Sequence, residues 1–107
     1  MLKIELNFRE RNLIFEKEKR LGFGKKGIIV KDIDGNKSNF FCKLNADYKG
    51  VSLQKGQLLL NTDYNEVPKK LIDKLLELNV IQYTDDGVID GFYYYPIVNY
   101  SEELFAL

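Results

Sequence analysis

Residues 67–78 read VPKKLIDKLLEL, and they form the one segment of this 107-residue chain whose apolar side chains recur at the period of an α-helix. Pro68 falls in the first turn, where its missing N–H costs nothing, and Asn79 favours a stop after the segment. A single helix with a leucine-rich face needs a sheet against which to bury that face. The segment therefore predicts an α+β fold in which one main helix, about 67–78, packs on a β-sheet.

Strand-like patterns fill most of the remaining sequence. Residues 2–8 alternate between apolar and polar side chains, as expected of a half-buried strand. Residues 9–12 indicate a polar turn, residues 34–37 a hairpin turn and residues 85–87, Asp-Asp-Gly, a further turn. Residues 13–21 suit either a strand or a short helix, and we favour a strand hairpinned to the first. The predicted strands are 2–8, 13–21, 28–33, 39–45, 58–61, 80–84 and 92–100, which amount to an antiparallel sheet of about five to seven short strands.

Length and composition indicate one small globular domain spanning residues 1–107. Hydrophobic residues make up 45% of the chain, which is typical of a globular protein. The single cysteine, Cys42, excludes an intramolecular disulfide and indicates a reducing compartment. No apolar run reaches the roughly 18 residues that a membrane span requires. We therefore expect a cytoplasmic protein without membrane contact.

The sequence lacks the residues that most catalytic sites use. Histidine is absent, which excludes His-based acid–base catalysis, Ser-His-Asp and Cys-His arrangements and most zinc sites. Residues 22–27 match the G-x-G-x-x-G nucleotide-binding pattern, but they lead into a strand rather than a helix. Cys42 lies in a strand pattern and is expected to pack as a small apolar residue. We therefore expect no enzymatic activity, no cofactor and no metal ion.

Charge is distributed unevenly along the chain. Residues 1–50 carry 12 Lys or Arg against 7 Asp or Glu, whereas residues 51–107 carry 4 against 9. Such a chain presents either one basic and one acidic docking surface, or two halves that interleave in the fold and neutralise each other.

Tyrosines are a second notable feature, and all of them fall within the C-terminal two thirds of the chain: Tyr48, Tyr64, Tyr83, Tyr93, Tyr94, Tyr95 and Tyr100. Exposed tyrosines favour protein interfaces, whereas partly exposed ones also serve to cover the edge of a core. Tyr93 and Tyr95 share one face of the last predicted strand. Together with Asp85, Asp86 and Asp90, they are the predicted contact residues for a protein partner.

The alternative function is a small nucleic-acid-binding protein that uses the basic N-terminal half. Its contacts would be Arg20, Lys25 and Lys26, with support from Arg9, Arg11 and Lys19. Tyrosines beside these cations would then stack on bases.

Features between residues 41 and 98 are similar to a small family of unknown function carried on bacterial mobile elements. They are Phe41-Cys42-Lys43-Leu44-Asn45, Gly56 before the 58–61 strand, the 68–78 helix and Gly91-Phe92-Tyr93-Tyr94-Tyr95-Pro96, a glycine-aromatic-x-x-x-proline strand. The first 40 residues depart from that pattern, and no functional residue of the family carries over. One branch of the family includes inhibitors of CRISPR–Cas9. The resemblance implies a counter-defence protein that binds a host complex, with a Cas effector as the partner.

Overall fold

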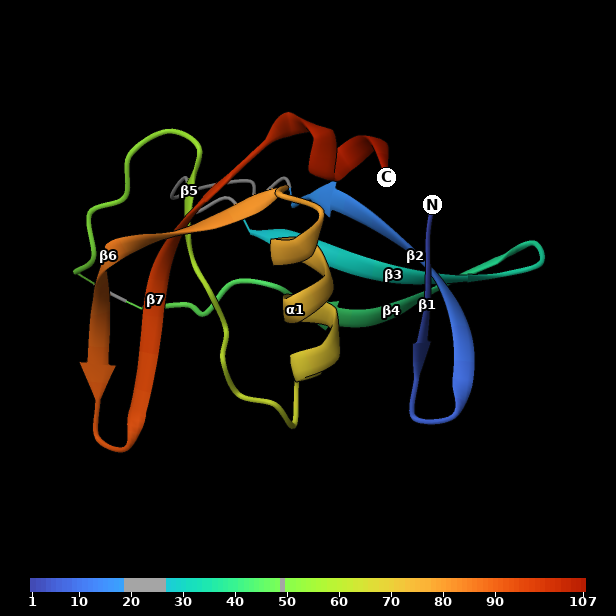
Figure 1. Cartoon of the computed structure of the whole chain (residues 1–107), viewed down its shortest axis with the longest axis horizontal. Helices are drawn as coiled ribbons and strands as arrows, with labels where there is room; N and C mark the ends of the chain where they lie inside the picture. Colours follow the sequence, from blue (N-terminus) through green and yellow to red (C-terminus); the bar gives the residue numbers. More distant parts are fainter. Residues whose placement is uncertain (19–26, 49) are drawn as a thin grey trace.

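Two antiparallel sheets flank one helix in this computed structural model, which describes residues 1–18, 27–48 and 50–107 (Figure 1). One sheet has the strand order β1-β2-β3-β4, and the other has the order β5-β7-β6. The elements are β1 Leu2–Leu6, β2 Arg9–Lys17, β3 Ile28–Asp34, β4 Lys37–Lys43, β5 Gln57–Leu59, α1 Lys69–Glu77, β6 Ile81–Asp90, β7 Tyr93–Tyr100 and the 3₁₀ helix η1 Glu102–Ala106. The α+β prediction is confirmed, although the strands divide between two sheets rather than forming one.

Both sheets share one hydrophobic core, with α1 between them (Figure 1). Leu71 and Leu75 of α1 are fully buried. They belong to the same cluster as Val30 in the four-stranded sheet and Val98 in the three-stranded sheet. The helix ends where Asn79 adopts a positive φ of 62°, the left-handed stop that the sequence predicts. Because one core serves both sheets, the position of the three-stranded sheet is fixed relative to the rest of the molecule.

The N-terminal hairpin differs from its prediction at the turn. Leu2, Ile4 and Leu6 are buried on one face of β1, as expected. Residues 9–12 are not a turn, however, but the first part of β2, which pairs with β1 through Glu5↔Glu10 and Leu6↔Arg9. The turn is formed by Asn7 and Phe8, which both have positive φ, so Phe8 is exposed instead of facing the core. The prediction was wrong because residues 9–12 are polar, as in many turns, although here they form the partly exposed start of a strand that extends beyond the core.

Residues 85–87 are also not a turn. They lie inside β6, where the register with β7 shifts between Tyr83 and Gly87 and produces a bulge. The Thr84 hydroxyl group fixes the bulge, because it accepts a hydrogen bond from the Asp86 N–H (3.1 Å) and donates one to the Ile97 carbonyl (2.8 Å). Pro96, which has no N–H to donate, pairs with Gly87 beside this interruption of the ladder.

Replacing Thr84 by Val tests the role of this hydroxyl group. Thr84→Val keeps the β-branched shape but removes both hydrogen bonds, so the free energy of unfolding is expected to fall by about 1–2 kcal/mol. Urea titration measures the change, with the exposed Ser38→Ala on β4 as the control. Equal stability of Thr84→Val and the wild type would mean that backbone pairing alone holds the bulge.

Cys42 is buried in the core, as expected of a small apolar residue. Burial is the main reason that the pKa of its thiol rises to about 12, and the charge of Glu66 adds to the effect. The thiol is therefore protonated at neutral pH and is a poor nucleophile. None of the helices in the described ranges has both the length and the apolar character needed to cross a membrane.

Candidate functional site

The β6–β7 hairpin exposes an unusual concentration of large apolar side chains. Ile89 is 77% exposed and Phe92, in the turn after β6, is fully exposed at 106%. The side chains of Tyr64, Tyr83, Tyr93 and Tyr94 are each about half exposed. We refer to these six residues as the hairpin surface: Tyr64, Tyr83, Ile89, Phe92, Tyr93 and Tyr94. The register pairs Ile89 with Tyr94 and Asp90 with Tyr93, so these exposed side chains occupy both faces of the hairpin. Scattered exposed apolar residues are normal in proteins, but such a concentration on one element is typical of a binding surface.

Two hollows lie beside residues 93–95 of the hairpin. The first, here called the aromatic hollow, has a volume of about 520 Å³ and is lined by Thr62, Tyr64, Tyr83, Thr84, Phe92, Tyr93, Tyr94 and Pro96. The second, here called the acidic hollow, has a volume of about 300 Å³ and is lined by Lys43, Asn45, Ala46, Asp47, Tyr48, Asn61, Asp63, Glu66, Asp90 and Tyr95. Within the described residues, no group of three or more His, Cys, Asp or Glu side chains is placed to hold a metal ion.

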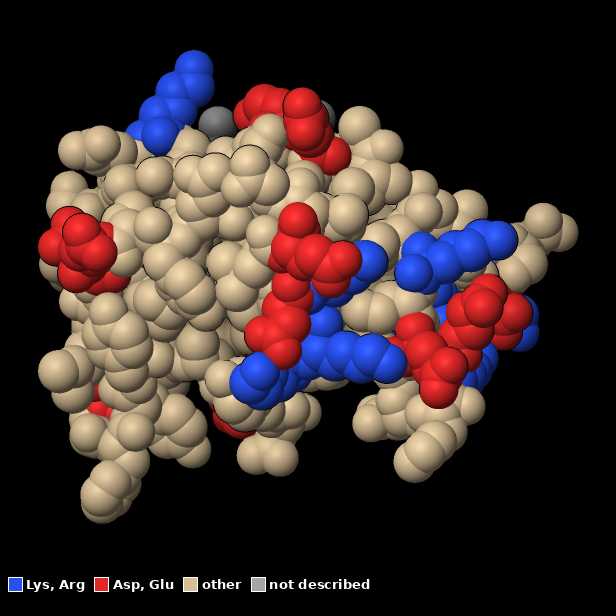
Figure 2. Space-filling model, in the orientation of Figure 1, with Lys and Arg blue, Asp and Glu red and all other residues tan. Residues whose placement is uncertain are grey.

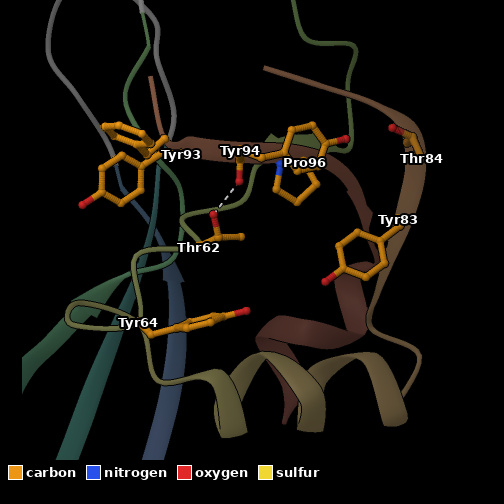
Figure 3. A pocket seen from close by; sticks show the side chains of 8 residues that line it. Thr62, Tyr64, Tyr83, Thr84, Tyr93, Tyr94 and Pro96 are labelled. Atoms are coloured by element: carbon orange, nitrogen blue, oxygen red, sulfur yellow. Dashed lines mark hydrogen bonds between the residues drawn. The ribbon is translucent and has the colours of Figure 1, made fainter. Parts of the chain in front are cut away.

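Local contacts fix the position of the aromatic side chains around the first hollow. The Tyr94 ring lies against the backbone of Gly87, where an added Cβ would come within 2.5 Å of the ring. The Thr62 hydroxyl donates a 2.6 Å hydrogen bond to the Tyr94 carbonyl, which ties the segment after β5 to the hairpin (Figure 3). The aromatic hollow is therefore supported from two sides, by β6 and by the segment that leads to α1.

A stacked pair of tyrosines contributes one ring to each hollow. The rings of Tyr93 and Tyr95 are 6.1 Å apart with an interplanar angle of 7°. Tyr93 lines the aromatic hollow and Tyr95 lines the acidic hollow. Their stacking confirms that these two side chains share one face of the last strand.

Tyrosine hydroxyl groups in the acidic hollow lie close to carboxylates. Partial burial raises the pKa of Tyr48, and so do the charge of Asp90 and a hydrogen bond to it. The pKa of Tyr95 is raised in the same way, by burial first and then by Asp90 and other neighbours. Both hydroxyl groups are therefore protonated at neutral pH, and that of Tyr48 donates a hydrogen bond to Asp90.

The structure brings three of the five predicted contact residues together. Asp90, Tyr93 and Tyr95 lie on the same face of the β6–β7 hairpin, with the pair Asp90↔Tyr93 directly opposite each other. Asp85 and Asp86 lie further along β6, exposed on the bulge. The alternative contacts Arg20, Lys25 and Lys26 lie outside the described residues.

Sequence reasoning did not assign Tyr48, Tyr64 or Tyr83 to the site. These residues come from a loop, from the segment before α1 and from β6, and only the tertiary fold brings them to the hollows. The sequence feature that could have assigned them to the site is the clustering of all seven tyrosines between residues 48 and 100.

Among the described residues, the negative charge of the C-terminal half of the chain, residues 51–107, is largely not neutralised by cations of the N-terminal half. No Lys or Arg occurs in residues 56–68 or 75–107, so the three-stranded sheet contains carboxylates but no cation. Of the ion pairs in which both residues are described, only Lys17–Glu102 joins the two halves. Figure 2 shows charges of both signs over α1 and the four-stranded sheet, while the region over β6 and β7 is largely uncharged, with an acidic group at its edge.

Several cations of the N-terminal half, residues 1–50, are instead paired within that half. Arg11 Nη1 lies 2.8 Å from Asp32 Oδ2, and Lys31 Nζ lies 2.8 Å from Glu16 Oε2. Lys43 Nζ lies 2.7 Å from Asp47 Oδ2. In the part of the four-stranded sheet that the structure describes, these pairings leave little positive charge for a phosphate backbone.

Comparison with protein-family models, with curated proteins and with solved structures gives no match to this chain. The residues of the site are therefore interpreted from their own chemistry.

Proposed function

We propose that this protein is a non-enzymatic binding module that docks onto a partner protein through the hairpin surface. One observation carries the proposal: five large, exposed apolar and aromatic side chains lie on one hairpin and a sixth, Tyr64, lies next to it, beside two hollows. Tyrosine and phenylalanine are enriched at the centres of protein interfaces, since a rigid ring covers a large area at a low entropy cost. Residues of this kind supply most of the binding energy in measured interfaces.

The charge around the hairpin indicates what kind of surface the partner presents. The three-stranded sheet carries Asp85, Asp86 and Asp90 without a compensating cation. A basic surface on the partner matches this charge and accelerates association. The basic channels of nucleic-acid-guided enzymes are surfaces of this kind.

The biological role that we propose for this chain is inhibition of a CRISPR–Cas effector or a similar defence complex. The resemblance to a mobile-element family with anti-CRISPR members supports this choice, and so does the acidic character of the hairpin. The protein would act in the cytoplasm, where such effectors reside and where its single cysteine remains reduced. Against the alternative of direct nucleic-acid binding, its supporting contacts Arg9 and Arg11 both have carboxylate partners, Asp34 and Asp32.

Reversing charge on the bulge tests the electrostatic part of this proposal. The double variant Asp85→Lys and Asp86→Lys is expected to abolish capture of the partner from host lysate at physiological salt. Its melting temperature should stay nearly unchanged, because changes at exposed positions typically alter stability by less than about 0.5 kcal/mol. The matched control is Glu5→Lys with Glu10→Lys, an exposed pair of carboxylates on the other sheet, which should retain the partner.

A salt series with nucleic acid alone distinguishes the two candidate functions. Direct binding of duplex DNA would weaken with a log–log slope of about −0.9 per phosphate contact. We expect no saturable binding to duplex or single-stranded nucleic acid at physiological salt. Saturable binding with such a slope, unaffected by the Asp85 and Asp86 reversal, would favour the nucleic-acid alternative.

A further inference from the structure

The aromatic hollow has a composition that points to one kind of ligand group. Its wall contains five aromatic rings, from Tyr64, Tyr83, Phe92, Tyr93 and Tyr94, together with two threonines and Pro96. Its volume of about 520 Å³ lies within the range of ligand-binding pockets. None of the described residues that line it is charged.

Resting on the proposed function, we propose that the aromatic hollow receives an arginine side chain of the partner protein. Aromatic faces attract cations through their ring quadrupoles, and arginine is the cation most often found on them. The guanidinium group is planar and weakly hydrated, so it stacks on a ring at a smaller desolvation cost than an ammonium group.

The hydroxyl groups at the hollow provide the complementary hydrogen-bond acceptors. Figure 3 shows Tyr64 and Tyr83 on opposite sides of the hollow, with their hydroxyl groups directed toward one another. Within the described part of the chain, neither hydroxyl group has a hydrogen-bond partner. Burial and the neighbouring Tyr64 and Asp73 raise the pKa of Tyr83, so its phenol stays neutral. Guanidinium carries five N–H donors and no acceptor, which suits two converging phenol oxygens.

Charge complementarity favours a cation over a neutral group. The hairpin that forms most of the hollow contains Asp85, Asp86 and Asp90 and no basic residue. A nearby cation, Lys69, is paired with Asp73 at 2.7 Å. The charged side chains of the hairpin are thus all negative, and the charge of Lys69 is offset by Asp73, so an arriving arginine meets no unpaired cation on the hairpin.

The test uses short peptides as probes and therefore needs no identified partner. The probe is acetyl-Gly-Arg-Gly-amide, and its neutral control carries citrulline in place of arginine. NMR titration is expected to show saturable shifts of the Tyr64, Tyr83, Tyr93 and Tyr94 ring signals, with affinity for the arginine peptide at least fivefold higher than for the citrulline peptide. Equal affinity for the two peptides, or shifts confined to other residues, would overturn the proposal.

Variants locate the binding within the hollow. Tyr83→Leu and Tyr64→Leu should each lower the affinity for the arginine peptide at least fivefold. Because two separate variants are tested, a folding defect in one of them would not decide the result. Phe40→Leu changes an aromatic residue of similar exposure on β4 and should leave the affinity unchanged. A proline peptide, acetyl-Ala-Pro-Pro-Ala-amide, that binds the same rings more tightly than the arginine peptide would reject arginine as the occupant. Loss of peptide recognition alone would leave the proposed protein-binding function standing, because that function is tested with the partner itself.

Discussion

Tyr93→Ala is expected to weaken binding to the partner protein about 30-fold, which corresponds to about 2 kcal/mol of binding free energy. Of the two stacked tyrosines, Tyr93 is the more accessible, at 50% exposure, and Tyr95 is less exposed. Its ring would be covered on docking, so its removal eliminates both apolar contact area and part of the aromatic hollow. Titration of the captured partner against wild type and variant measures the loss.

The matched control for Tyr93→Ala is Phe40→Ala. Phe40 is 68% exposed on β4, which belongs to the other sheet, so its removal deletes a comparable ring outside the hairpin surface. We expect Phe40→Ala to bind within twofold of the wild type. If both variants lose affinity equally, or if only Phe40→Ala does, the contact surface lies elsewhere.

Leu75→Ala is expected to lower the free energy of unfolding by about 2–5 kcal/mol. Leu75 is fully buried on the face of α1 that contributes to the core shared by the two sheets, and the neighbouring elements cannot close the resulting cavity without losing contacts with one sheet. Because this range is a large part of the stability of a small domain, the variant will be close to unfolding at growth temperature.

Two probes in a urea titration examine whether the core is shared. Every tyrosine lies between residues 48 and 100, so tyrosine fluorescence reports mainly on the three-stranded sheet and its surroundings, while circular dichroism reports on the whole chain. Both transitions should shift together in Leu75→Ala. The control is Leu78→Ala, at a residue that is 37% exposed at the end of the helix, and it should change the free energy of unfolding by less than about 1 kcal/mol. A change below about 0.5 kcal/mol in Leu75→Ala would mean that α1 does not pack on the sheets.

The helix could be predicted from sequence because its evidence is local. The apolar residues of α1 repeat at the helical period, and Pro68 and Asn79 mark its ends. The hairpin turn at residues 34–37 and the burial of Cys42 were also predictable from short segments. In each case the residues that decide the structure are neighbours in sequence.

The errors arose where distant residues decide the structure. Asp85-Asp86-Gly87 has the composition of a turn, but Thr84 hydrogen-bonds to Ile97 of β7 and holds the segment inside a strand as a bulge. Similarly, the polar start of β2 forms a strand because β1 and β3 pair with it on both sides. The division into two sheets depends on such long-range pairing as well.

The candidate site was only partly predictable for the same reason. Tyr93 and Tyr95 belong to one predicted strand, so strand alternation placed them on the same face, whereas the position of Asp90 opposite Tyr93 depends on the pairing of β6 with β7. Tyr64 joins them from the segment before α1 and Tyr83 from the start of β6, and no local pattern predicts that their hydroxyl groups face one another across the aromatic hollow.

Site-specific photo-crosslinking at position 92 tests most directly whether this chain works through protein contact at the hairpin surface. Phe92 is fully exposed in the turn before β7, so benzoylphenylalanine replaces it without disturbing the core. Irradiation in host cells should yield a discrete protein adduct from position 92 and none from position 40, where the same replacement serves as the control. An adduct with nucleic acid at position 92, or a protein adduct at position 40 alone, would contradict the proposed function.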